Sequence, residues 1–285
     1  MRWLAAWLLL ACVSSLAVAG EPAVEQGLSA DQIVEKNVAA RGGLDAWRKI
    51  QTMAWIGHIE GANAPVADLP FALLQKRPNE THFEIQAQNR ISLRVYDGAH
   101  GWKLRPTSSS GKPELQPFTA EELSFAHDGQ GIDGPLMDYQ AKGVAVALDG
   151  IDEVEGRKAY RLNVKLPSGA SHHVWIDAKT FLDVKYDRES RNSFGLSGKL
   201  SVFYRNYKMI DGVQIPLTIE SGADNGKGTS KMVIDKVLLN PPLQDTLFAK
   251  PDIPGLSNAA SAGRVQARTA RLMRPRSLAV PKEAP

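Results

Sequence analysis

The sequence predicts a mainly β protein in which one large antiparallel sheet is accompanied by few helices. Apolar and polar residues alternate along most of the chain, most clearly over Ala159–Leu166, and this two-residue period is typical of a strand with one apolar and one polar face. Turn signals such as Asp97-Gly98 and Pro167-Ser168-Gly169 separate the alternating segments. Segments with a helical period are few, which favours an antiparallel sheet.

The first 19 residues have the features of a secretory signal peptide. A basic start precedes the apolar run Trp3–Leu10, and the small residues Ala17 and Ala19 fit cleavage after Ala19. The run is too short to span a membrane, which needs about 20 apolar residues. Alternatively, the segment contains a lipoprotein-processing box ending at Cys12, which would then carry a lipid anchor. Both alternatives predict export.

The chain has a single cysteine, Cys12, so cleavage after Ala19 leaves 266 residues without a disulfide. Such a chain must be stabilised by its core alone, and it is long enough to do so as one domain.

Positive charge is concentrated in the C-terminal tail, residues 257–285. The tail carries six Lys or Arg and one acidic residue, whereas the chain without the tail and Arg2 has 27 basic and 30 acidic residues. We therefore expect no nucleic-acid binding by the folded body. The tail is rich in Ala, Ser, Arg and Pro and is predicted to be disordered, with weak attraction to an anionic membrane surface as its alternative role.

A helical segment is predicted near the start of the mature chain, after a flexible N-terminus at residues 20–28. Ser29 and Gln32 form a capping-box pattern, a stripe of apolar residues with helical spacing follows, and Gly42-Gly43 ends the helix. Leu44–Ile50 is interpreted as a further turn of helix.

About eleven strands are predicted after this start. Strand-like alternation begins at Met53, Trp55 and Ile59, which places Trp55 on a buried face. The eleven segments that follow are Phe71–Lys76, Thr81–Ala87, Ile91–Tyr96, Gly101–Leu104, Val144–Leu148, Lys158–Leu166, His172–Ile176, Leu182–Asp187, Lys199–Tyr207, Gln214–Ser221 and Thr229–Leu238.

Both faces of the predicted sheet carry apolar side chains. Trp175 alternates with Val174 and Ile176, so we expect it on the opposite face from these two residues. A sheet that is apolar on both faces needs cover on both, from helices, a second layer or a ligand.

An insert at residues 117–143 interrupts the strand pattern. Thr119 can cap a helix over Ala120–Ala126, and a glycine-rich turn precedes an apolar group. That group consists of Ile132, Leu136, Met137 and Tyr139. The insert is a candidate lid, and the alternative is a helix packed permanently on one face of the sheet.

No residue pattern predicts catalysis, a cofactor or a metal ion. The sequence lacks a Gly-x-Ser-x-Gly elbow, a His-x-x-x-His pair, a cysteine cluster and a phosphate loop. The run Gly129-x-Gly131-x-x-Gly134 matches a dinucleotide fingerprint by letter only, because no βαβ unit surrounds it. His172 and His173 are neighbours in a strand and point to opposite faces. We expect a protein that is not an enzyme.

Several segments in order suggest a known family. They are Ala39–Trp47, Lys76-Arg77-Pro78-Asn79, Tyr96-Asp97-Gly98 with Gly101-Trp102, Gly134–Tyr139, Asp211–Pro216, and Asn240-Pro241 with Leu247-Phe248. Together they resemble the outer-membrane lipoprotein-sorting family, whose members share the fold of the periplasmic lipoprotein carrier LolA. The resemblance covers roughly residues 29 to 255.

The resemblance implies an open, strongly curved half-barrel over residues 29–256, with helices capping it and a concave face that binds acyl chains or another lipid. It implies a periplasmic carrier, expected to be monomeric, with lipid or lipoprotein acyl chains as ligand and a membrane protein as donor or acceptor. Two rivals stay open: a periplasmic sensor or scaffold that binds a protein partner through the same groove, and an exported hydrolase.

The candidate groove residues combine buried-face positions with apolar residues of the insert. They are Trp47, Trp55, Leu123, Phe125, Leu136, Met137, Tyr139, Val174 and Ile176. In the empty carrier the lid would drop its apolar side chains into the groove, so that a lipid replaces one apolar filling by another. That exchange keeps the net affinity modest although each methylene removed from water contributes about 0.8 kcal/mol.

Overall fold

The computed structural model describes residues 27–61, 68–87, 90–106, 113–129, 131–191, 197–223 and 230–252. The predicted signal peptide at 1–19, most of the segment 20–28 and the tail 257–285 lie outside the described residues.

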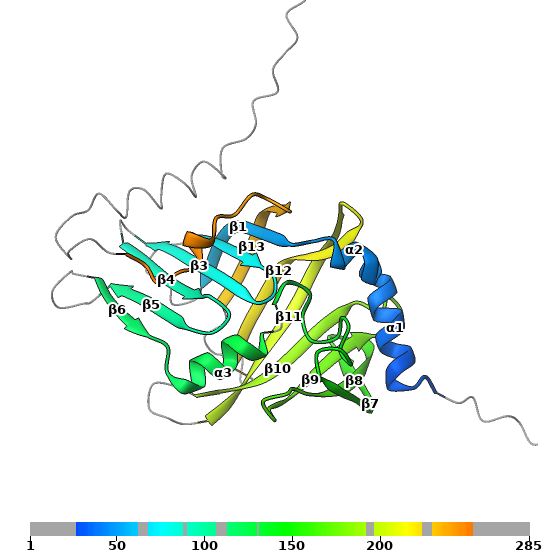
Figure 1. Ribbon diagram of the computed structural model, residues 1–285. Helices are drawn as coiled ribbons and strands as arrows, with labels where there is room; N and C mark the ends of the chain where they lie inside the picture. Colours follow the sequence, from blue (N-terminus) through cyan, green and yellow to red (C-terminus); the bar gives the residue numbers. More distant parts are fainter. Residues whose placement is uncertain are drawn as a thin grey trace, which may run out of the picture.

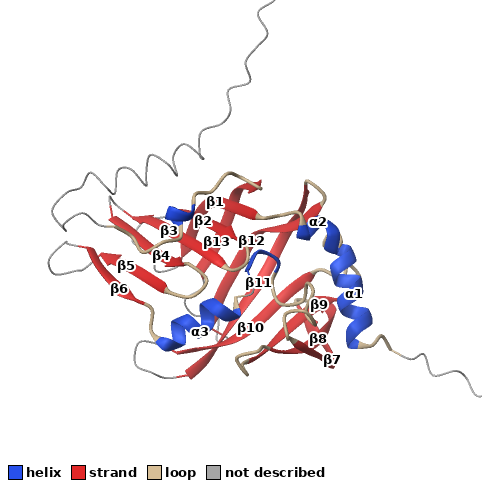
Figure 2. Cartoon of the chain, in the orientation of Figure 1, coloured by secondary structure: helices blue, strands red, loops and turns tan. Residues whose placement is uncertain are grey.

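A single antiparallel sheet dominates the fold, and thirteen strands within the described residues build it (Figure 1). The strands are β1 Thr52–Gly61, β2 Leu69–Lys76, β3 Glu80–Ala87, β4 Arg90–Tyr96, β5 Gly101–Pro106, β6 Pro113–Pro117, β7 Ala145–Val154, β8 Arg157–Lys165, β9 Ser171–Asp177, β10 Asp183–Arg191, β11 Ser197–Ile210, β12 Val213–Ala223 and β13 Ser230–Leu239. The predicted fold class is confirmed: the sheet is an open, curved half-barrel with few helices (Figure 2).

The strand count exceeds the prediction of about eleven by two. One extra strand is β1, whose alternation the sequence indicates from Met53 onward. The other is β6, a five-residue edge strand with a proline at each end. Proline cannot donate a ladder hydrogen bond, so this segment lacks the usual signature of a strand.

The order of the strands determines where the insert has to run. The sheet order is β6-β5-β4-β3-β2-β1-β13-β12-β11-β10-β9-β8-β7, so the first and last strands pair in the middle of the sheet. Strands β6 and β7 are consecutive in sequence but lie at the two opposite edges. The connection between them, residues 118–144, therefore crosses from one edge of the half-barrel to the other.

Three α-helices accompany the sheet in the described part of the chain: α1 Ala30–Ala40, α2 Leu44–Arg48 and α3 Ala120–Asp128. The capping box at the start of α1 is present, because Ser29 Oγ accepts from the amide of Gln32 and the Gln32 side chain accepts from the amide of Ser29. No helix among the described residues is long and apolar enough to cross a membrane.

Helix α1 covers the inner face of strands β7 to β10. Its residues Ile33 and Val34 pack in one cluster with Val174 and Ile176 of β9. Trp175 lies on the opposite, outer face, where it packs with Val184 and two other buried residues. The predicted opposition of Trp175 and its neighbours is confirmed.

The outer face of the first half of the sheet is covered by the segment that follows β13. Phe248 is buried there against Ala54 of β1 and Leu74 of β2, with Leu243 and Leu247 beside it. Each face of the sheet is therefore covered over part of its width, which agrees with its two-sided apolar pattern.

A β-bulge between β1 and β13, in the middle of the sheet, bends the sheet. The register between β1 and β13 shifts between Ile56 and Gly57. A Cβ at Gly57 would lie 1.9 Å from the carbonyl oxygen of Val233, so only glycine allows the two strands to approach this closely.

Candidate functional site

The insert begins directly after the edge strand β6 with an aromatic residue that packs on the sheet. Phe118 packs directly on Gly101 of β5, where a Cβ would lie 2.0 Å from the phenyl ring. Thr119 then caps α3, since its hydroxyl accepts from the amide of Glu122 and the Glu122 carboxylate accepts from the amide of Thr119. The predicted helix start is confirmed.

The turn between β2 and β3 holds the end of α3. Asn79 Nδ2 donates to the carbonyls of Ala126 and His127 at 3.1 and 3.0 Å, and the Asn79 Oδ1 accepts from the amide of Gly131 at 3.1 Å. A Cβ at Gly131 would lie 2.6 Å from the carbonyl oxygen of Pro78. One asparagine therefore ties the insert to the first half of the sheet.

Asp133 anchors the next part of the insert through a buried carboxylate. Its side chain is 5% exposed and accepts from Arg77 at 2.7 Å and from Lys142 at 2.6 Å. Arg41 donates to the Asp133 carbonyl at 3.2 Å. Burial lowers the pKa of Lys142, and the nearby Asp133 carboxylate opposes that effect.

The segment 131–143 also contributes to the hydrophobic core. Leu136 packs in the cluster beneath α1, and Met137 packs with Trp47 and Met53 in the cluster beneath α2. The Tyr139 hydroxyl donates to Asp31 of α1 at 2.6 Å, and this bond to a carboxylate raises the pKa of Tyr139.

Helix α3 is held in a different way, because none of its apolar residues is buried. Leu123 is half-buried, and Phe125 is 45% exposed. The helix is tied to the sheet by Glu122, which accepts from Lys103 at 2.7 Å and from Arg94 at 3.0 Å. Partial burial acts to raise the pKa of Glu122, but these hydrogen bonds lower it to about 2.

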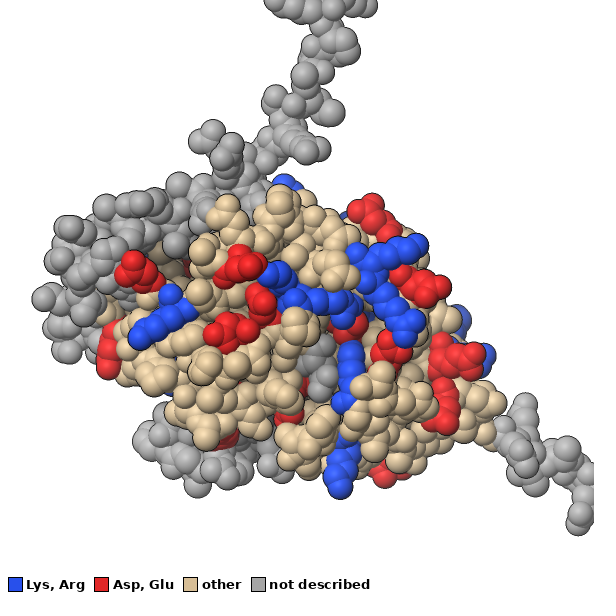
Figure 3. Space-filling view, in the orientation of Figure 1, with Lys and Arg blue, Asp and Glu red and all other residues tan. Residues whose placement is uncertain are grey.

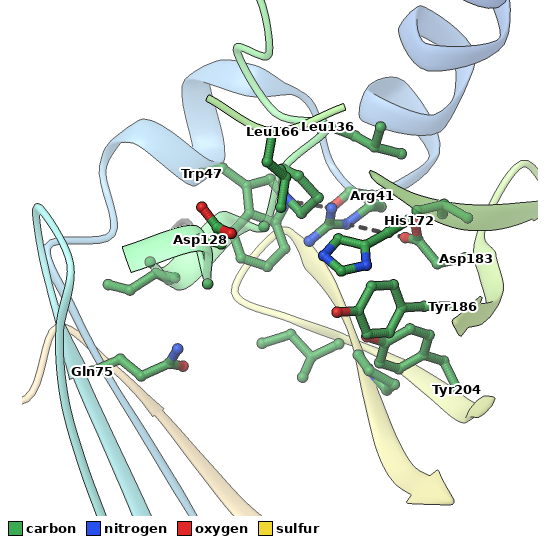
Figure 4. Close-up of a pocket in the computed structure, with 18 of the residues that line it drawn as sticks. Arg41, Trp47, Gln75, Asp128, Leu136, Leu166, His172, Asp183, Tyr186 and Tyr204 are labelled. Atoms are coloured by element: carbon green, nitrogen blue, oxygen red, sulfur yellow. Dashed lines mark hydrogen bonds and ion pairs between the residues drawn. The ribbon is translucent and has the colours of Figure 1, made fainter. Parts of the chain in front are cut away.

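Beneath the insert lies a cavity of about 280 Å³ (Figure 4). Its walls come from both halves of the sheet, from the loop after α1, from α2 and from the insert. The apolar wall consists of Trp47, Trp55, Phe125, Ile132, Pro135, Leu136, Leu166, Val174, Ile215 and Pro216. Polar lining groups are supplied by Arg41, Gln75, Asp128, His172, Asp183, Tyr186, Tyr204 and Tyr207.

Arg41 and Asp183 form an ion pair at the polar side of the cavity. Arg41 Nε lies 3.7 Å from Asp183 Oδ2, and its guanidinium stacks 4.6 Å from the centre of the Trp47 ring. The Tyr207 hydroxyl donates to the carbonyl of Asp183 at 3.0 Å, and deep burial raises the pKa of Tyr207.

On the face of the molecule seen in Figure 3, positive and negative side chains are interspersed. Among the described residues on that face, Asp and Glu side chains lie beside the Lys and Arg side chains. Among the described residues, no group of three or more His, Cys, Asp or Glu is arranged to hold a metal ion.

The structure brings five of the nine predicted groove residues to the cavity wall: Trp47, Trp55, Phe125, Leu136 and Val174. The other four, Leu123, Met137, Tyr139 and Ile176, are not among the lining residues. Met137 and Ile176 are instead fully buried in the two core clusters.

The polar lining residues are absent from the predicted groove set. His172 could have been identified, because it shares the inner face with Val174, two residues further along β9. Its neighbour His173 lies on the outer face beside Trp175, with ring centres 5.8 Å apart, so the predicted opposition of the two histidines is confirmed. Arg41 lies in the Ala39–Trp47 segment that carries the resemblance, but no pattern predicts that its side chain, or that of Asp128, lines the cavity.

Comparisons with known proteins agree with this architecture. A domain from Vibrio parahaemolyticus described as an outer membrane lipoprotein-sorting protein domain superposes with a TM-score of 0.51 and 12% identity, over 76% of this chain and 95% of that one. A LolA superfamily protein from Nitrosomonas europaea superposes with a TM-score of 0.50 and 15% identity, over 79% and 99%. No protein-family model and no curated protein matches the chain by sequence. The chain thus has a LolA-like fold, as the resemblance implies.

Proposed function

We propose that this protein is an exported, periplasmic carrier that shields an acyl chain or the apolar part of another lipid beneath its insert. The supporting observation is the cavity, whose apolar wall includes Trp47, Trp55, Leu136 and Val174. A mainly apolar cavity with a few converging polar groups is the usual form of a small-molecule site. A membrane protein would deliver or receive the lipid.

The volume of the cavity indicates how large a lipid it can hold. At about 280 Å³ it lies near the lower end of typical ligand sites, which span roughly 300–1,000 Å³. This supports one chain, or part of one chain, and a larger lipid would need the insert to move. Ten methylenes removed from water would contribute up to about 8 kcal/mol, before the cost of displacing protein groups is subtracted.

Helix α3 is the part of the insert that would move. Phe125, Asp128 and Gly129 at its C-terminal end line the cavity, yet no apolar residue of the helix is buried. Displacing α3 would expose little of the core, whereas displacing the segment 131–143 would expose Leu136 and Met137.

The proposal is tested by mass spectrometry of lipid extracted from the full chain purified from its native cell envelope. We expect a bound lipid, and we expect Phe125→Glu to retain less of it. Leu148→Glu is the matched control, because Leu148 is a comparably exposed residue, 39% against 45%, that does not line the cavity.

Two outcomes would contradict the carrier function. One is that no apolar compound is retained and a fluorescent fatty-acyl probe does not bind. The other is a stable complex between lipid-free protein and a protein partner that occupies the cavity, which would favour the sensor or scaffold alternative.

A further inference from the structure

Asp128 has a buried carboxylate oxygen that makes no hydrogen bond within the described residues. It is the last residue of α3, its side chain is 7% exposed, and it lines the cavity. Ser168 Oγ donates to Asp128 Oδ2 at 2.7 Å, but Oδ1 has no hydrogen-bond partner. The nearest cationic candidate, His127 Nδ1, lies 3.7 Å from Oδ1 and belongs to a largely exposed side chain.

An unsatisfied buried carboxylate oxygen is unfavourable, because the group loses its water without a replacement. In Figure 4, Asp128 and the Arg41–Asp183 pair lie on opposite sides of Trp47. Arg41 is engaged by Asp183 and by the carbonyl of Asp133. A ligand in the cavity can therefore supply the donor that Asp128 Oδ1 lacks.

The charges of the cavity wall favour a cation. Arg41, Asp128 and Asp183 are the charged residues that line it in the described part of the chain, and the first and last of these are paired with each other. Asp128 is left with the exposed His127, 3.7 Å away, as its cationic neighbour, and has no cationic partner on the cavity wall. It also stands at the C-terminal end of α3, where the aligned peptide dipoles add negative potential.

We propose that the ligand is an amphiphile with a protonated amine head, whose ammonium group donates to Asp128 Oδ1 while its chain lies along Trp47, Trp55 and Leu136. This inference rests on the proposed function, since it names the class of lipid for the same cavity. An anionic carboxylate head at this position would meet the Asp128 charge and would be disfavoured.

The test compares three probes with one identical twelve-carbon chain: dodecylamine, dodecanol and dodecanoate. Each is titrated below its micelle concentration into the full-length mature protein, and binding is followed by calorimetry. We expect dodecylamine to bind at least about tenfold more tightly than dodecanoate, because a hydrogen bond between charged groups contributes at least that factor. This comparison uses the wild-type chain and does not depend on the folding of any variant.

Two variants refine the test. Asp128→Asn keeps the size of the side chain and the acceptor for Ser168, and we expect it to remove the preference for the amine while dodecanol binds as before. Glu121→Gln makes the same change of charge on the exposed side of α3 and should keep the preference. Thermal unfolding checks that both variants fold.

The outcomes separate this inference from the function on which it rests. If dodecanoate binds as tightly as dodecylamine or more tightly, or if Asp128→Asn keeps the full preference while folded, the amine assignment is wrong and the apolar cavity stands. If none of the three probes binds, the proposed carrier function is itself wrong.

Discussion

The two halves of the insert are held by different forces. Helix α3 has no buried apolar residue and is attached by polar contacts. Glu122 makes them at its first turn, and Asn79 and Ser168 make them at its last. The segment 131–143 places Leu136 and Met137 in two separate core clusters. Its buried Asp133 carboxylate forms an ion pair with Arg77.

This difference bears on the two alternatives that the sequence leaves open, a lid or a permanently packed element. The segment 131–143 has the packing of a permanent core element, whereas α3 has the exposure and the polar attachment of a movable one. We infer that each alternative applies to one half of the insert, and the following predictions test that division.

The largest effect is expected at the buried carboxylate. Asp133→Asn leaves Arg77 and Lys142 without their shared anion, and breaking a buried pair costs about 3–5 kcal/mol. We expect the free energy of unfolding, measured by urea denaturation, to fall by about 3 kcal/mol. The control is Asp138→Asn, whose pair with Arg48 is exposed and should contribute less than about 1 kcal/mol. Equal losses in the two variants would contradict the role of Asp133.

A smaller effect is expected from truncating an apolar side chain in each half. Met137→Ala removes a fully buried side chain, so we expect a loss of about 2–3 kcal/mol in the free energy of unfolding. Leu123→Ala in α3 should cost about 1 kcal/mol or less, because Leu123 is only half-buried. The division of the insert fails if the order of the two losses is reversed.

The attachment of α3 is expected to depend on pH. The ionised Glu122 is favoured in the folded state, where its pKa is about 2 instead of the usual 4.5. Its stabilising contribution is therefore present above pH 4.5 and is lost as the pH falls from 4.5 to 2. We expect the Glu122→Gln variant to have a free energy of unfolding about 1 kcal/mol lower than that of the wild type near neutral pH.

Thermal unfolding of both proteins across this pH range provides the measurement. The difference between wild type and Glu122→Gln should shrink towards zero at pH 2. A difference that stays constant from pH 6 to pH 2 would show that the carboxylate does not hold the helix through its charge.

The smallest effect on stability is expected for Phe125→Ala. Phe125 is 45% exposed, so its truncation should change the free energy of unfolding by less than about 0.5 kcal/mol. Because Phe125 lines the cavity, the same variant should bind a fatty-acyl probe several-fold more weakly. Leu148→Ala serves as the control and should leave the affinity for the probe unchanged.

Local sequence signals are sufficient for the regular parts of this fold. Ser29 and Thr119 start helices through capping boxes, each of which can be recognised from four consecutive residues. The alternation of Val174 and Trp175 assigns these two residues to opposite faces of the sheet. These features depend only on near neighbours along the chain.

The polar residues of the cavity could not be predicted in this way, because local backbone irregularities in β10 and β11 interrupt the two-residue alternation of side chains. A register shift between Asp183 and Lys185 places both Asp183 and Tyr186 on the cavity side. Tyr204 and Tyr207 likewise both line the cavity, on either side of Asn206, whose φ is +54°. A two-residue period would put the members of each pair on opposite faces.

The central position of the first and last strands has a consequence for how the chain folds. Within each half of the sheet every strand pairs with its neighbour in sequence, so β1 to β6 and β7 to β13 can each grow as a series of hairpins. Among the strand pairings of the described residues, only that of β1 with β13 joins segments far apart in the chain. Loop-closure entropy makes such a contact slow to form, and we expect two locally assembled meanders to be joined late, at this single junction.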